Sequence, residues 1–256
     1  MLKDVLDQPD HIRDALWRVD SAQLKARPSS GLVVCGMGGS AIGGELARGL
    51  LGDRLTGPLV VVRAYTLPGW VNHEWAVLAS SYSGDTEETL ASFKIAGDVG
   101  THRWVAGTGG KLGEQARDAH VGIVGLPGLF QPRVTVAYMT VVATATAYLA
   151  GIAPDVSTEI ENAATYVENS RDSLQDLAIQ LAEQILDTPV VVHGADLTVP
   201  VARRWANRLN GHARCLAFSL HWLGQRRATG PVRSAPWTTT GVSRLCSARW
   251  VARACR

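Results

Sequence analysis

The sequence predicts an α/β protein built on a doubly wound parallel sheet, in three layers of helices, strands and helices. Two observations indicate this class. Short apolar runs alternate with helix-like segments through residues 27–150, and the loops that join them are short. Glycine- and serine-rich loops follow two of the apolar runs, and sheets of this kind bind their ligands at the carboxyl ends of strands.

The predicted elements follow in chain order. Residues 1–26 are charged and predict one or two helices, with Asp10 as an N-cap. Apolar runs predict five strands, over residues 32–35, 59–63, 75–80, 102–107 and 121–126. Helix-like segments follow them, over residues 45–51, 86–96, 111–117 and from 134 onward.

A second unit is predicted over residues 151–210. It opens with an amphipathic helix over 157–186 that is broken once, continues with the apolar strand 189–194, and ends in a helix over 198–209. The order of strand and helix repeats that of the first unit. The sequence therefore predicts a first sheet domain over 27–150 and the start of a second, similar one.

The segment 211–256 has an aberrant composition. It holds eight Arg and no Asp, Glu or Lys, with Trp and Cys scattered among them and no clear period. A basic tail that binds nucleic acid is one interpretation. Such tails usually use Lys and few Trp or Cys, so we predict no nucleic-acid partner. The favoured hypothesis is that this tail is an out-of-frame translation of a GC-rich gene.

Composition and cysteine usage predict a cytoplasmic protein. The chain is 46% hydrophobic and 19% charged, with a formal net charge of +2. Its four Cys show neither disulfide nor metal-site spacing, and the charged N-terminus lacks the apolar core of a signal peptide. Residues 134–154 are uncharged, but Thr, Tyr and Ala favour a buried helix over a membrane span.

The first loop, Gly36 to Gly44, is suited to an anion. Glycines let backbone N–H groups approach a ligand closely, and the N-terminus of the next helix adds a favourable dipole. Ser40 can donate a hydroxyl hydrogen bond. Two alternatives stay open: a tight turn without a ligand, and a dinucleotide site in which Ala41 takes the last glycine position of G-x-G-x-x-G.

The second loop, Ser80 to Thr89, lies between a predicted strand and a predicted helix. It carries three hydroxyl residues, Ser81, Ser83 and Thr86. Hydroxyls and backbone amides hold a phosphate without needing a lysine. The plain alternative is an ordinary helix start, beginning at Thr86, in which Asp85 or Thr86 only caps the helix.

Together the two loops, GMGGSAIGG and SYSGDTEET, resemble the signatures of the bifunctional phosphoglucose/phosphomannose isomerase family. Three further matches support this: YTLPGWV at 65–71, FQPR at 130–133 and ARRWANRLN at 202–210. The family's members carry two sugar isomerase (SIS) domains with a flavodoxin-like three-layer fold. The resemblance implies interconversion of glucose 6-phosphate or mannose 6-phosphate with fructose 6-phosphate through a cis-enediol, in a homodimer.

The resemblance also implies site residues. The sugar 6-phosphate would be bound by small and hydroxyl residues of the two loops, namely Gly38, Gly39, Ser40, Ser81, Ser83 and Thr86. Arg133 would bind substrate and stabilise the intermediate, because a fixed guanidinium offsets the charge of an enediolate. A surface salt bridge is the plain alternative for Arg133.

The sequence departs from the family pattern after the ARRW helix. The family's base is the Glu of an Asn-Glu-Asn run, and here Gly211 stands between Asn210 and His212. The family's later His and Lys are also missing, since no Lys follows Lys111. The resemblance therefore implies an isomerase with impaired catalysis.

The main rival from another class is a non-catalytic phosphosugar sensor, in which the ligand shifts a conformational equilibrium. We predict no metal and no cofactor, because the sequence shows no metal cluster, no Walker-type lysine and no Ser-His-Asp arrangement.

Overall fold

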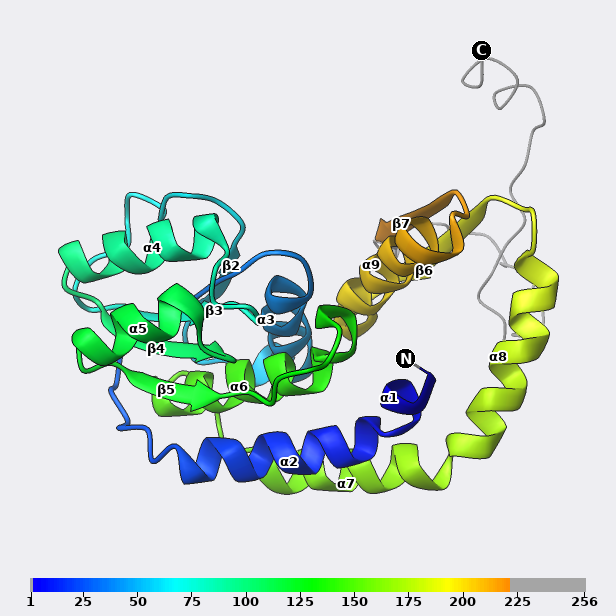
Figure 1. Cartoon of the computed structure of the whole chain (residues 1–256), viewed down its shortest axis with the longest axis horizontal. Helices are drawn as coiled ribbons and strands as arrows, with labels where there is room; N and C mark the ends of the chain where they lie inside the picture. Colours follow the sequence, from blue (N-terminus) through cyan, green and yellow to red (C-terminus); the bar gives the residue numbers. More distant parts are fainter. Residues whose placement is uncertain (1, 222–256) are drawn as a thin grey trace, which may run out of the picture. The chain divides into compact units, whose positions relative to one another are not determined.

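The computed structural model describes residues 2–221, and the chain divides after Asp172 into two compact units (Figure 1). The first unit opens with helices α1 (Leu2–Leu6) and α2 (Gln8–Ser21). The prediction that Asp10 caps a helix is wrong. Asp7 occupies the N-cap position of α2, and Asp10 lies inside the first turn.

The sheet of the first unit has five parallel strands. These are β1 (Leu32–Cys35), β2 (Leu59–Val62), β3 (Ala76–Ser80), β4 (His102–Gly107) and β5 (Gly122–Gly125). Their order in the sheet is β2-β1-β3-β4-β5, which confirms the predicted doubly wound sheet. After β1 the chain adds β2 on one side of it and then β3 on the other side. The topological switch point therefore lies between β1 and β3.

Helices cover both faces of this sheet (Figure 1). They are α3 (Gly38–Leu51), α4 (Glu87–Asp98), α5 (Gly110–Asp118) and α6 (Val136–Leu149). Alternate residues of β1 serve opposite layers, because strand side chains alternate between faces. Leu32 and Val34 pack in the cluster of α3 and α6, whereas Val33 and Cys35 pack with Ala96 of α4.

Helix α6 is the apolar segment for which a membrane span was the alternative. Its threonines donate their hydroxyls to carbonyls of the preceding turn, as Thr146 does to Val142 O at 2.9 Å. This satisfies the polar atoms inside the core. Within residues 2–221, no helix is long and apolar enough to cross a bilayer.

A close contact joins α3 and α6. An ideal Cβ placed on Gly43 would overlap Met139. Only glycine permits this approach between the two helices.

Helix α7 (Ser157–Asn169) lies beside α2 in the first unit (Figure 1). Arg13 of α2 forms ion pairs of 2.8 Å with both Glu161 and Glu168 of α7. Contacts therefore group residues 151–172 with the first unit, whereas the sequence predicts a second domain that begins at 151. The functional division at that point stays a prediction.

The second unit contains most of α8 (Arg171–Ile185), followed by β6 (Val190–Gly194), α9 (Val199–Arg208) and β7 (Ala217–His221). Short helical turns η1 (Gly52–Arg54), η2 (Pro132–Val134), η3 (Asp196–Thr198) and η4 (Leu209–Ala213) complete the described elements. Strands β6 and β7 pair in parallel, which is the expected start of a second α/β domain. The predicted single break between α7 and α8 falls at Ser170.

Strand β7 lies in the segment 211–256, whose sequence shows no clear period. Residues 217–221 therefore form a regular element that no periodicity indicates, and the assignment of 211–256 to a separate tail stays a prediction. The hypothesis of an out-of-frame tail falls mainly on residues 222–256, which lie outside the described residues.

Candidate functional site

The first candidate loop turns into α3 earlier than predicted. The helix begins at Gly38, not Glu45, so Gly39 and Ser40 belong to its first turn. Gly38 has φ +47°, and no atom lies within 4 Å of where its Cβ would be. Glycine is favoured in this left-handed conformation, and the first backbone N–H groups of a helix point out of its N-terminus toward a potential anion.

The second loop is organised by its own hydroxyl groups. Ser81 is only 1% exposed, and its Oγ lies 2.9 Å from Thr86 Oγ1. Ser81 Oγ also accepts the N–H of Gly84 at 3.1 Å. Helix α4 begins at Glu87 and not at Thr86, which takes the N-cap position without a capping side-chain bond. The alternative of a merely capped helix start therefore loses its support from Thr86.

Asp85 likewise does not cap α4. Its Oδ1 accepts the backbone N–H of Lys111 at 3.1 Å and so ties the second loop to the start of α5. Ser83 Oγ accepts the N–H of Asp85 at 3.2 Å, and the Ser83 side chain is exposed. The second loop is thereby held at one end by α5 and keeps an exposed hydroxyl.

The two loops and the Arg133 segment meet at the carboxyl edge of the sheet. An ideal Cβ on Gly36 would lie 2.8 Å from Ser80 O, so the first loop touches the end of β3. An ideal Cβ on Gly39 would lie 2.9 Å from Pro132 O, in the turn η2 that carries Arg133. These contacts place all the candidate segments around the switch point between β1 and β3.

The candidate side chains differ in exposure. Ser40 is 9% exposed and Ser81 is almost fully buried, whereas Ser83 is exposed and Thr86 and Arg133 are half-buried. The described contacts bring Ser81 and Thr86 together directly, and they bring Ser40 and Arg133 to the same edge through backbone neighbours.

Tyr82 was given no role by the sequence and has a structural one. Its hydroxyl donates to Pro127 O at 3.0 Å and accepts the N–H of Phe130 at 2.9 Å. Burial raises the pKa of the Tyr82 phenol. Tyr82 thus connects the segment that precedes Arg133 to the second loop. Its position inside the SYSGDT motif is the sequence feature that could have indicated this role.

The position of the family's base lies in the second unit. Gly211 belongs to η4, and no atom lies within 4 Å of its ideal Cβ. His212 Nδ1 lies 3.3 Å from Arg208 O, a local contact within the helical segment. Across residues 2–221, no three His, Cys, Asp or Glu side chains are grouped so that they could hold a metal ion.

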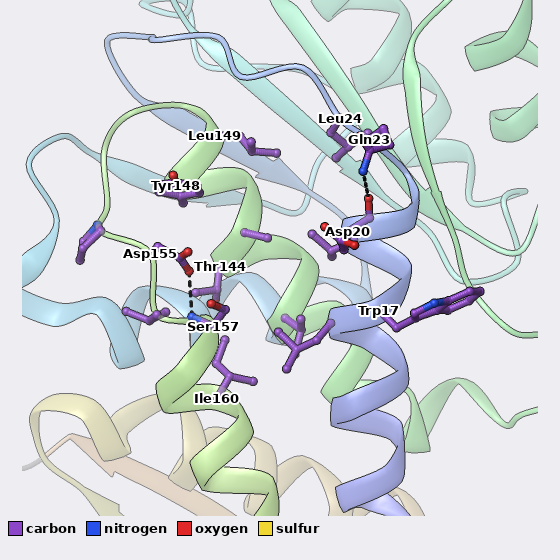
Figure 2. Close-up of a pocket in the computed structure, with 16 residues that line it drawn as sticks. Trp17, Asp20, Gln23, Leu24, Thr144, Tyr148, Leu149, Asp155, Ser157 and Ile160 are labelled. Carbon is purple, nitrogen blue, oxygen red and sulfur yellow. Dashed lines mark hydrogen bonds between the residues drawn. The ribbon is translucent and has the colours of Figure 1, made fainter.

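A cavity of about 560 Å³ opens between α2, α6 and the start of α7 (Figure 2). Its lining is mostly apolar, and its charged members are Asp20 and Asp155. Figure 2 shows Asp155 accepting the N–H of Ser157, at 2.9 Å. Two carboxylates among apolar groups disfavour a phosphate, and no predicted site residue lines this cavity.

The fold and the site's place in it define an α/β sugar isomerase (SIS) domain. Solved structures share the fold, including the C-terminal domain of glucosamine-fructose-6-phosphate aminotransferase from Francisella tularensis. That match has a TM-score of 0.65 at 15% identity and covers 86% of this chain and 69% of that one. Tagatose-6-phosphate ketose/aldose isomerase from Escherichia coli matches with a TM-score of 0.56 at 16% identity, over 86% of this chain and 66% of that one.

Sequence relatives identify the family. The model of the bacterial phospho-glucose isomerase C-terminal SIS domain matches residues 174–222. A bifunctional phosphoglucose/phosphomannose isomerase of Caldicellulosiruptor bescii is 30% identical over 228 residues, 85% of this chain and 67% of the relative. One from Aquifex aeolicus is 34% identical over 192 residues, 75% of this chain and 58% of the relative. The chain belongs to the bifunctional phosphoglucose/phosphomannose isomerase family.

The chain is also similar to an epimerase. The D-glucosamine-6-phosphate 4-epimerase of Sulfolobus acidocaldarius is 28% identical over 187 residues, 72% of this chain and 57% of the relative. The aligned part of this chain spans 58% of the length of the Aquifex relative and 67% of that from Caldicellulosiruptor.

Proposed function

We propose that the first unit binds a sugar 6-phosphate between the ends of β1 and β3, and that the chain is an isomerase of glucose 6-phosphate or mannose 6-phosphate and fructose 6-phosphate with impaired catalysis. The observation that carries the proposal is that two helix starts, at Gly38 and Glu87, follow the adjacent strands β1 and β3, and that the hydroxyl pair of Ser81 and Thr86 lies in the second of these loops. Helix N-termini and hydroxyls together suit a phosphoryl group.

The proposed site residues divide into a group that binds the substrate and one residue, Arg133, that stabilises the intermediate. The amides and hydroxyls of Gly38, Gly39, Ser40, Ser81, Ser83 and Thr86 hold the phosphate or the sugar hydroxyls. Arg133 offsets the negative charge of the enediolate that forms when a proton leaves the carbon next to the carbonyl. Gly211 supplies no side chain to take that proton, so the chemical step is slow.

On the same family resemblance, we propose that the chain acts in the cytoplasm and assembles into a homodimer. Sedimentation of the purified full chain tests the dimer, since a single species with the mass of one chain contradicts it.

Replacing Ser81 by Ala should weaken binding of fructose 6-phosphate by about 1–3 kcal/mol. The change removes a hydroxyl that is nearly buried at the centre of the second loop. Calorimetric titration of the full chain measures the affinity directly.

Ser83→Ala gives a second variant at an exposed position, where the loss of the bond from the Asp85 N–H should change the fold little. Ser29→Ala is the matched control, because Ser29 Oγ donates to Arg27 O at 2.7 Å, away from both loops. Equal affinity in the wild type and in both loop variants would contradict the proposed phosphate site.

A further inference from the structure

The proposed phosphate site leaves the segment after β2 without a task, although this segment begins the YTLPGWV match. It lies at the same edge of the sheet as the two loops. The N–H of Gly36, in the first loop, donates to Val62 O at the end of β2 at 3.1 Å. Arg63, Ala64 and Tyr65 therefore leave the sheet directly beside the first loop.

Two contacts to buried side chains hold this segment between the helices that start at the loops. Arg63 Nη1 lies 2.8 Å from Glu45 Oε1, and Glu45 on α3 is only 4% exposed. Ser92 on α4 is fully buried and donates its hydroxyl to Ala64 O at 2.9 Å. A buried carboxylate and a buried hydroxyl with partners fix backbone geometry, because losing either partner is costly. The backbone next to Tyr65 is thus anchored on both sides.

Tyr65 itself is left facing solvent at the rim of the site. Its side chain is 52% exposed, and its hydroxyl lies 3.4 Å from Glu87 Oε2. Glu87 directly follows Thr86, whose hydroxyl belongs to the proposed phosphate site. We call the two loops that form this site the phosphate cradle. A separation of 3.4 Å is longer than a strong hydroxyl–carboxylate bond, so the pair retains capacity for a ligand hydroxyl.

The charge beside Tyr65 and Glu87 favours the sugar part of a ligand over its phosphate. A carboxylate repels a phosphate but accepts hydrogen bonds from sugar hydroxyls. The carboxylates of Glu88 and Glu87 also raise the pKa of Tyr65, so its phenol stays protonated and able to donate. The rim therefore suits the polyol part of a sugar phosphate.

We propose that Tyr65 and Glu87 form the sugar-facing wall of the site and contact hydroxyl groups of the bound sugar phosphate. This inference rests on the proposed phosphate site and adds a specificity-determining pair to it. Tyr65 donates to or accepts from one hydroxyl, and Glu87 accepts from the same or a neighbouring one. Arg63 and Glu45 act as positioning residues that hold the wall in place.

The test compares two probes, fructose 6-phosphate and inorganic phosphate, by calorimetry on the full chain. Tyr65→Phe should weaken fructose 6-phosphate binding about 3- to 10-fold and leave inorganic phosphate within about twofold. Tyr166→Phe is the matched control, since Tyr166 is also exposed but lies on α7. This control should change neither affinity.

Glu87→Gln provides a readout that a merely structural role would not give. It should weaken fructose 6-phosphate binding while strengthening that of inorganic phosphate, because a repelling charge is removed. Unchanged fructose 6-phosphate affinity in both variants overturns the wall, even where the Ser81 result supports the cradle. Equal losses for both probes also overturn it. A wild-type chain that binds neither probe overturns the phosphate site and the wall together.

Discussion

In a coupled assay with fructose 6-phosphate, the chain should turn over about 10²–10⁴-fold more slowly than the Aquifex relative. The expectation follows from Gly211, which stands where the family pattern has a carboxylate and which carries no group that takes a proton. The assay measures glucose 6-phosphate as it forms. Turnover at the rate of the relative would contradict our account of the missing base.

Gly211→Glu tests the same account from the opposite side. The ideal Cβ of Gly211 meets no atom within 4 Å, so the first carbon of a new side chain meets no obstacle. We expect a measurable gain in turnover from Gly211→Glu and none from the isosteric but non-basic Gly211→Gln. A chain that binds fructose 6-phosphate and shows no turnover in any of the three forms would favour the sensor hypothesis.

Gly84→Ala should lower the free energy of unfolding by roughly 2–5 kcal/mol. Gly84 has φ +78°, a conformation that disfavours any side chain, and its ideal Cβ would overlap the carbonyl oxygen of Gly109. Because the obstacle is backbone, a rotamer change does not relieve it. Denaturant unfolding followed by circular dichroism measures the loss.

Gly69→Ala is the matched control for that change. No atom lies within 4 Å of the ideal Cβ of Gly69, so this variant should stay within about 0.5 kcal/mol of the wild type. Near-equal stability of the Gly84 and Gly69 variants would show that the backbone of the loop between β3 and α4 rearranges at little cost. That result would contradict a rigid loop, which the proposed phosphate site requires.

The strands were largely predictable because each is a short apolar run in a sheet that is buried on both faces. The start of α3 was not predictable, since glycines are poor helix formers and a run of them predicts a loop. Tertiary packing explains why glycines occur in this helix, since an ideal Cβ on Gly44 would lie 2.9 Å from a methyl group of Val34. No local pattern reveals such a packing contact.

Strand β7 was missed for a related reason. Of its residues, Ala217 is buried, and the four that follow are exposed, so neither alternation nor a buried run marks it. Its parallel pairing with β6 is a nonlocal feature of the fold.

The candidate site was predictable only in part. Hydroxyls and glycines that follow strands indicated the two loops from the sequence alone. The pairing of Tyr65 with Glu87 and the two hydrogen bonds of Tyr82 join residues distant in sequence. Their partners depend on strand order, which the sequence did not specify.

The tight approach of Gly43 to Met139 has a consequence for motion at the carboxyl edge of the sheet, where the binding site is proposed. Helix α3 begins at the first loop, and α6 begins just after the turn that carries Arg133. Two helices locked together along their flanks slide poorly, because close-packed interiors resist small displacements. The amides of Gly38 and Gly39 and the Arg133 backbone should therefore shift as one rigid body, which keeps their spacing constant as the molecule fluctuates.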